Sequence, residues 1–459
     1  MKKIKLFPIL SFAGLALAIL LISCKKFVQV GPPPTQAELS KIFSSDQTAN
    51  SATIGLYYQM AANNLTFFNG AITVYTGLSG DEIVNVNANS GYDAFKINSI
   101  QSDNSTINSK FWNNAYTYIY QANAVLEGLN NSTTLTQSVK QQLEGEMLFT
   151  RALNYFYLVN LFNDVPLEKS TDYNVNSVMP RTASKKVYEQ IIADLIVAKN
   201  LLNSSLPTST NTRPNKWAAT ALLARVYLYQ KDWANAEEQA SEVINSEAYN
   251  LEPNLNNVFI STSQETIFQL MRPTSNTSEG SAFIPASTSA KPVFAVTNYL
   301  LNEFETGDNR KTSWLRSNTV NGQSYYYPYK YKVRSSTTVS EYYIVIRLAE
   351  LYLIRAEAKA EQNNITGAQA DINIIRNRAG LLNTAASTVS DLLTAVANER
   401  QVELFAEWGH RWLDLKRMGT ADEILSIRKG PAWHASDTLY PIPFTQIQRN
   451  PFLTQNSGY

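Results

Sequence analysis

The chain has 459 residues, of which 17% are charged, and its formal net charge is +1 at pH 7. This balance argues against a surface for nucleic acid or anionic lipid, since both need an excess of basic residues. The sequence has one cysteine, Cys24, which excludes an intramolecular disulfide and a metal site built on several cysteines.

The N-terminus is typical of an exported, lipidated bacterial protein. Lysines within residues 2–5 precede an apolar stretch over residues 6–22, which is the arrangement of a signal peptide. The stretch ends in Leu-Ile-Ser-Cys24, which resembles a lipobox, in which the cysteine receives a diacylglycerol and the chain is cut before it. We predict a signal peptide over residues 1–23 and a lipidated linker over residues 24–34. An uncleaved anchor with an incidental cysteine is the alternative.

The body, residues 35–459, is predicted to be mainly α-helical because apolar residues recur at helical spacing. Residues 217–244 and 346–379 are each predicted to form two helices joined by a short turn, with alanines at the crossing, which is the tetratricopeptide pattern. Between them, residues 251–342 are rich in Ser, Thr, Asn and Pro and are predicted to be a loop-rich insert that forms part of a second lobe. Within it, SYYYPYKYKV (324–333) predicts a strand.

One further helix is predicted over about residues 390–418, and it carries the residues that could support catalysis. Three glutamates lie one turn apart on one face, followed by a histidine and an aspartate one turn apart: Glu399, Glu403, Glu407, His410 and Asp414. Paired carboxylates near a histidine could perform general acid–base hydrolysis or hold a metal.

A structural ion network explains the same residues without catalysis. Glu407 is expected to pair with Arg411, while Arg400 and Arg417 meet carboxylates of neighbouring helices. The sequence has no zinc-protease, serine-hydrolase or phosphate-loop motif. We therefore predict a protein that is not an enzyme and that needs no cofactor or metal.

Aromatic residues in predicted loops are the favoured ligand contacts. A flat ring can pack on the CH face of a sugar while polar neighbours bind its hydroxyl groups, and no helical stripe assigns these rings to the core. The candidates are Trp314, Tyr325, Tyr326, Tyr327, Trp433 and Tyr92. The alternative is that the rings pack the insert against the helices.

Five segments, in order along the chain, resemble motifs of the SusD/RagB family of outer-membrane nutrient-binding lipoproteins. They are FWNNAYTYIYQANAVLEGL (111–129), RALNYFYLVNLFNDVPL (151–167), VIRLAELYLIRAEAKAE (345–361), ERQVELFAEWGHRWLDLKRMG (399–419) and YPIPFTQIQRNPFLTQNSGY (440–459). The resemblance covers nearly all of the chain beyond the predicted signal peptide.

The resemblance implies tetratricopeptide-like helix pairs beside an irregular lobe, with no catalytic residues. It implies a lipid-anchored, surface-facing protein of the cell outer membrane. It also implies a ligand, usually an oligosaccharide and in some members a peptide, and a SusC-like TonB-dependent transporter as the partner that receives it. The family's ligand residues lie in variable loops, so none transfers to this chain by motif. A tetratricopeptide scaffold that binds other proteins is the alternative from a different class.

Overall fold

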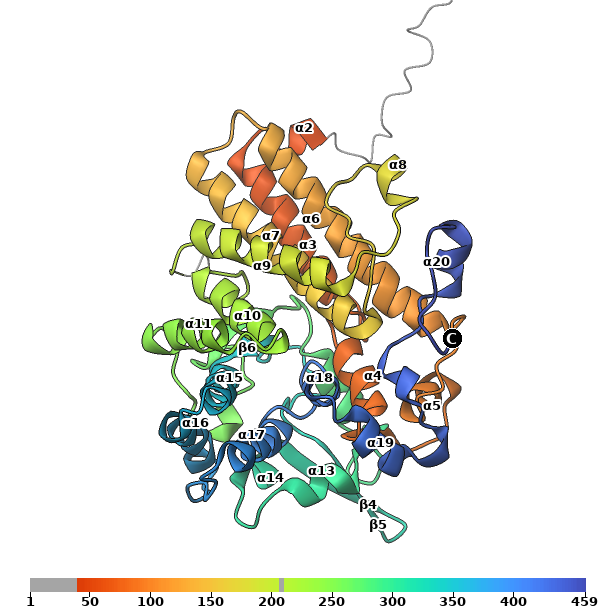
Figure 1. Cartoon of the computed structure of the whole chain (residues 1–459), viewed down its shortest axis with the longest axis vertical. Helices are drawn as coiled ribbons and strands as arrows, with labels where there is room; N and C mark the ends of the chain where they lie inside the picture. Colours follow the sequence, from red (N-terminus) through yellow and green to blue (C-terminus); the bar gives the residue numbers. More distant parts are fainter. Residues whose placement is uncertain (1–38, 206–209) are drawn as a thin grey trace, which may run out of the picture.

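The computed structural model describes residues 39–205 and 210–459, which form a mainly helical body with three two-stranded sheets (Figure 1). Cys24 and the predicted signal peptide and linker lie outside the described residues. Within the described ranges, no helix has the length and apolar character needed to cross a membrane.

The elements follow one another in three stretches. Up to residue 245 they are α2 (Leu39–Ile42), α3 (Asp46–Ala62), α4 (Ala71–Ser79), β1 (Ile83–Asn85), α5 (Ser90–Lys96), the π-helix η2 (Ile107–Trp112), α6 (Asn113–Asn131), α7 (Gln137–Phe162), α8 (Tyr173–Asn176), α9 (Ser184–Leu201), α10 (Lys216–Tyr229) and α11 (Trp233–Asn245). Between residues 251 and 347 they are η3 (Leu255–Asn257), β2 (Thr266–Leu270), α12 (Ser278–Phe283), β3 (Phe294–Val296), α13 (Asn298–Glu303), α14 (Asn309–Trp314), β4 (Leu315–Val320), β5 (Gln323–Pro328) and β6 (Tyr343–Arg347). After residue 347 they are α15 (Leu348–Glu361), α16 (Ile365–Arg378), α17 (Val389–Glu403), α18 (His410–Met418), α19 (Ala421–Lys429), η4 (Gly430–Ala432), η5 (Ala435–Thr438) and α20 (Phe444–Arg449).

The two predicted tetratricopeptide-like pairs are confirmed. Helix α10 packs against α11, and α15 packs against α16. Helix α11 also packs against α15, so the two pairs stack although the insert separates them in the sequence. Ala224, Ala236 and Ala240 are buried, which lets the helices of the first pair approach closely.

The turn between the two helices has the same local structure in both pairs. Lys231 in the first turn and Asn363 in the second have left-handed backbone, with φ of 56° and 61°. The next residue, Asp232 or Asn364, caps the second helix, because its side chain accepts a hydrogen bond from a backbone N–H of the first helical turn. The repeated turn chemistry gives the two pairs a common geometry.

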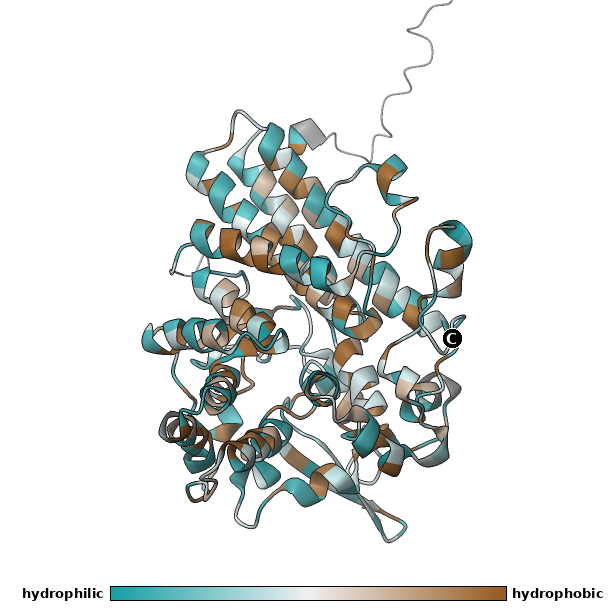
Figure 2. Ribbon diagram, in the orientation of Figure 1, coloured by the Kyte–Doolittle hydropathy of each residue, from teal (hydrophilic) through white to brown (hydrophobic). Residues whose placement is uncertain are grey.

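Helix α7 is the central helix of the N-terminal half. It packs against α6 and α9, and almost all of its side chains between Leu143 and Phe162 are buried. Figure 2 shows hydrophobic residues interleaved with hydrophilic ones along most helices, the pattern expected of helices that bury one face.

Each of the three small sheets is an antiparallel pair: β1 with β3, β2 with β6, and β4 with β5. The strand predicted over residues 324–333 is confirmed for its first part, which is β5. It ends at Pro328, and the next N–H, of Tyr329, donates to the carbonyl of Trp314 at 2.7 Å. The chain then turns inward, since the Lys330 side chain is buried.

The single helix predicted over residues 390–418 is wrong, because the structure has two helices separated by residues 404–409. Trp408 and Gly409 in this break have left-handed backbone. The N–H of Trp408 donates to Thr73 Oγ1 at 3.0 Å, and a Cβ on Gly409 would lie 2.3 Å from the Thr76 hydroxyl. Contacts with α4 therefore override the local helical pattern.

Candidate functional site

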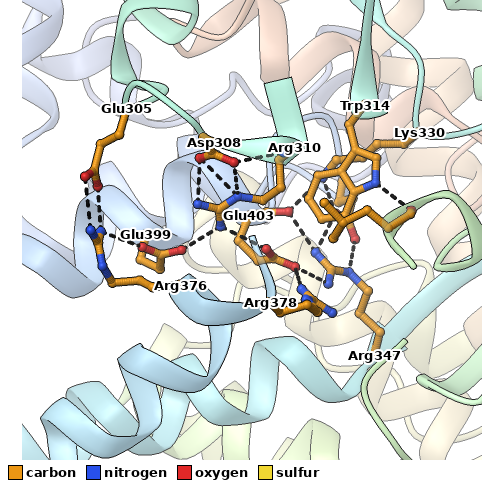
Figure 3. Close-up of polar contacts among 12 residues, drawn as sticks. Glu305, Asp308, Arg310, Trp314, Lys330, Arg347, Arg376, Arg378, Glu399 and Glu403 are labelled. Atoms are coloured by element: carbon orange, nitrogen blue, oxygen red, sulfur yellow. Dashed lines mark hydrogen bonds and ion pairs between the residues drawn. The ribbon is translucent and has the colours of Figure 1, made fainter. Parts of the chain in front are cut away.

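The glutamates considered for catalysis lie in a buried ion network between the insert and the helices (Figure 3). Glu403 is at its centre. Arg310 donates to it at 3.0 Å and Arg347 at 2.6 Å, and Arg378 makes a third ion pair. The carboxylate thus meets three guanidinium groups from three different elements.

The network extends from Glu403 to both neighbouring glutamates. Glu407 accepts hydrogen bonds from Arg347 Nε at 2.8 Å and from Lys330 Nζ at 2.5 Å. Glu399 accepts one from Arg310 Nη1 at 2.5 Å. Each of the three glutamates therefore lies within hydrogen-bond distance of a buried cation, and all three are themselves buried.

The electrostatics of Glu403, Glu407 and His410 do not suit proton transfer. Burial by itself would raise the pKa of Glu403, but the surrounding arginines outweigh it and hold the pKa far below the usual range. The pKa of Glu407 is likewise lowered, because Arg347 and Lys330 outweigh burial. Burial lowers the pKa of His410 to about 4, so this histidine is neutral at pH 7. Buried, cation-saturated carboxylates form a structural network and offer no acid to a substrate.

The predicted partner of Glu407 is wrong. Arg411 pairs instead with Asp81, to which its Nε donates at 2.9 Å. Asp81 is buried and lies just after α4, far from Arg411 in the sequence. The break before α18 explains the change, because it removes Arg411 from the helical register that would place it one turn after Glu407.

The other two predicted arginine pairs are confirmed. Arg400 Nε lies 2.7 Å from Asp414 on α18, and Arg417 makes a bidentate ion pair with Glu357 on α15. Within residues 39–205 and 210–459, no group of three His, Cys, Asp or Glu side chains is placed to hold a metal ion.

Three of the six aromatic candidates are packed inside the protein: Trp314, Tyr327 and Trp433. The indole N–H of Trp314 donates to the carbonyl of Leu255 at 2.9 Å, and that of Trp433 donates to Asp422 at 2.8 Å. A buried ring cannot present a face to a ligand in this structure, so the expectation of ligand contact is withdrawn for these three.

The other three candidates keep part of their surface. Tyr326 is 36% exposed, and Tyr325 and Tyr92 are half-buried. Because side chains alternate along a strand, Tyr325 and Tyr326 lie on opposite faces of the β4–β5 hairpin. Asn318, paired with Tyr325, donates to backbone carbonyls of residues 287–290, so the Tyr325 face is the one toward that segment.

The structure brings Tyr92 and Tyr325 to the same segment of the insert. The ring of Tyr92 lies 4.9 Å from that of Phe294, and Lys291 Nζ lies 5.5 Å from the ring centre of Tyr325. Strand β3, which contains Phe294, pairs with β1 just before the helix that carries Tyr92. We call Tyr92, Lys291 and Tyr325 the lobe face; Phe294, against which Tyr92 packs, is itself buried.

Sequence reasoning missed two more exposed rings. Tyr120 is 51% exposed and Tyr173 is 78% exposed, and both line a groove of about 550 Å³ between α6, α8 and α20. The four-residue spacing of Trp112, Tyr116 and Tyr120 is a signal that could have found the first, because it places three rings on one helical face. No comparable local signal marks Tyr173.

Two family models match the chain. One, described as "Starch-binding associating with outer membrane", covers residues 26–228, and the other, "SusD family", covers residues 164–459. The chain belongs to the SusD family. SusD-family proteins are binding proteins and not enzymes, in agreement with the structural ion network. The family description associates the chain with glycan binding and with the outer membrane.

Named relatives agree with the family models. SusD-like protein P2 of Formosa agariphila is 27% identical, over 91% of this chain and 93% of the relative. A SusD superfamily protein of Bacteroides vulgatus has a TM-score of 0.81 at 21% identity, covering 90% of this chain and 99% of that one. A laminarin-binding SusD-like protein has a TM-score of 0.75 at 25% identity, with the same coverage. The predicted fold class, mainly α with tetratricopeptide-like pairs and a loop-rich lobe, is confirmed.

Proposed function

We propose that this SusD-family chain is a surface lipoprotein, tethered to the outer membrane through Cys24, that captures an oligosaccharide and delivers it to a SusC-like TonB-dependent transporter. The family supports glycan binding, and the lipobox-like sequence at Cys24 supports the tether. The observation that carries the proposal in this chain is the lobe face, where two partly exposed tyrosine rings flank one loop of the insert.

The chemistry of the lobe face suits a sugar. The rings of Tyr92 and Tyr325 can pack against CH groups, while Lys291 and the hydroxyls of Ser287 and Ser289 in the same segment can bind the hydroxyl rim. At ~0.3 kcal/mol per non-hydrogen atom, a disaccharide of roughly two dozen such atoms gains at most about −7 kcal/mol. Binding is therefore expected in the micromolar to millimolar range, which allows release to a transporter.

Alanine substitution at the lobe face tests the site. Tyr325→Ala and Tyr92→Ala are each expected to weaken binding about tenfold, because each removes one packed ring. Retardation in affinity gels containing starch or laminarin, the glycans named for relatives, measures the change. Tyr326→Ala reports on the opposite face of the hairpin, and Tyr58→Ala, a 53% exposed tyrosine on α3, is the matched control. Unchanged retardation of both lobe-face variants, in a gel that retards the wild-type protein, would rule out this site.

Pull-down from envelope extracts separates the proposal from its rivals. Recovery of a β-barrel transporter supports nutrient delivery. Recovery of soluble proteins alone, lost on substitution of exposed residues of α10 and α11, would instead support a tetratricopeptide scaffold. A peptide-binding member of the family would bind short peptides and none of the glycans.

A further inference from the structure

The aromatic groove between α6, α8 and α20 lies away from the lobe face, since α8 and α20 are at the upper right of Figure 1 and β4 and β5 are at the bottom. Its volume of about 550 Å³ falls within the range of small-molecule sites, ~300–1,000 Å³. The rings of Trp112 and Tyr116 are packed 5.0 Å apart at its base. Tyr120 and Tyr173 are open to solvent at its edge, which leaves two aromatic faces unused by the fold.

A carboxylate without a partner lies among these rings. The backbone carbonyl of Glu168 accepts hydrogen bonds from Asn123 and from Tyr155, at 3.1 Å and 2.9 Å. Its side-chain oxygens, by contrast, have no hydrogen bond or ion pair with any part of the chain that the structure describes. Burial raises the pKa of Glu168 to about 7. A half-buried, unpaired carboxyl group gains from any ligand that donates hydrogen bonds to it.

The opposite side of the groove supplies complementary polar groups. The side-chain amide of Gln446 donates to Asn108 and to Asn113, both at 2.9 Å, which fixes its orientation and leaves its carbonyl oxygen as an acceptor. Arg449, the last residue of α20, also lines the groove; it is exposed and makes no ion pair with the described residues. The groove thus has an aromatic floor and is lined by one acidic side chain, Glu168, and one basic side chain, Arg449.

We propose that this groove is a second binding site, for a neutral sugar, distinct from the lobe face. A ligand with a net charge would leave either Glu168 or Arg449 facing a like charge, whereas hydroxyl groups can donate to the first and accept from the second. The open rings of Tyr120 and Tyr173 fit the CH faces of a sugar. The inference rests on the proposed glycan function and extends it, because two separate sites on one receptor allow two segments of a long polysaccharide to bind together.

Binding to a variant that lacks the lobe face tests the second site. The probes are maltoheptaose, laminariheptaose, cellohexaose, mannohexaose and xylohexaose, titrated against the full mature chain and followed by ligand-observed NMR. The Tyr92→Ala/Tyr325→Ala variant is expected to retain millimolar binding of at least one probe. Adding Tyr120→Ala and Tyr173→Ala to it is expected to weaken that residual binding at least tenfold.

The control and the outcomes separate the two sites. Adding Tyr58→Ala instead, on an exposed tyrosine elsewhere, should leave residual binding unchanged. Two results would overturn the second site and leave the proposed function intact. One is the absence of residual binding in the lobe-face variant, and the other is residual binding that the Tyr120→Ala and Tyr173→Ala substitutions do not weaken. Loss of all binding from the groove substitutions alone would support the groove and remove the lobe face. A wild-type protein that binds none of the probes would overturn both sites.

Glu168→Gln tests the polar part of the groove separately from its rings. Measured at pH 8, where the carboxyl group is mostly ionised, the substitution keeps the shape of the side chain but removes the charge that strengthens hydrogen bonds from sugar hydroxyls. In the lobe-face variant we expect residual binding to weaken about fivefold to tenfold. Unchanged affinity would show that the carboxylate takes no part. Equal thermal unfolding of all groove variants and their parent confirms that the helices are intact.

Discussion

Glu403 shows how a residue that resembles an acid catalyst can be structural. It is buried against Arg310, Arg347 and Arg378, so its removal leaves three buried cations without their common counter-ion. Glu403→Ala is expected to lower the free energy of unfolding by about 3–5 kcal/mol, measured by urea denaturation. Glu305→Ala is the control, since this carboxylate is 53% exposed and should cost less than about 1 kcal/mol. Equal losses in the two variants would contradict the structural role of the network.

Glu279 predicts a pH dependence of stability. It is buried, neither carboxylate oxygen makes a hydrogen bond of normal length, and burial raises its pKa from 4.5 to about 7. The folded protein therefore keeps a proton that the unfolded chain releases near pH 4.5. This contribution to stability is complete below pH 4.5 and is lost as the pH rises toward 7, by at most ~1.4 kcal/mol per pH unit.

Glu279→Gln, which carries no charge at any pH, should remove that dependence. The stability of the variant relative to the wild type is expected to rise between pH 5 and pH 7 and then to level off. Urea denaturation at a series of pH values measures the difference. A difference that does not change with pH would show that Glu279 titrates normally in the folded state.

At the residue scale, the sequence predicted that the three glutamates lie in an ion network, but not which cations surround them. Three glutamates on one helical face repel one another, so cations from elsewhere were required. Two of those cations, Arg310 and Lys330, come from the insert, where no local pattern reveals which side chains turn inward. The same limit explains Trp314, whose ring packs 4.7 Å from the buried ammonium group of Lys330. An aromatic residue in an irregular segment carries no sequence signal that separates burial from exposure.

At the scale of elements, the sequence predicted those helices and strands whose structure depends on residues close together in the chain. The pairs α10–α11 and α15–α16 were predictable because their apolar spacing, alanines and capped turns all lie within some 35 residues. The break between α17 and α18 was not, because it depends on contacts of Trp408 and Gly409 with α4, more than 300 residues earlier. The strand β5 was recognisable, whereas its partner β4 and the other pairings were not.

The proposed lipid tether would act on the whole molecule, and it can be tested on the full sequence. Cys24→Ser removes the only thiol, so the protein should stay unprocessed or leave the detergent-extracted envelope fraction. Ser23→Ala is the control, because it keeps a small residue before the cysteine. Immunoblots of fractionated cells measure both size and location. Envelope retention and normal processing of Cys24→Ser would contradict lipid attachment at this residue.

The buried ion network also constrains the motions available to the insert in the proposed transfer of a sugar. Arg310 from the insert and Arg347 at the end of β6 share Glu403 with Arg378 of α16. Pulling the insert away from the helices would strand these charges in a medium of low polarity, at a cost of several kcal/mol per ion. The network therefore opposes a hinge motion that would separate the insert from the helices. Under the proposed function, the receptor would therefore keep its internal shape and move as one body when a sugar passes to the transporter.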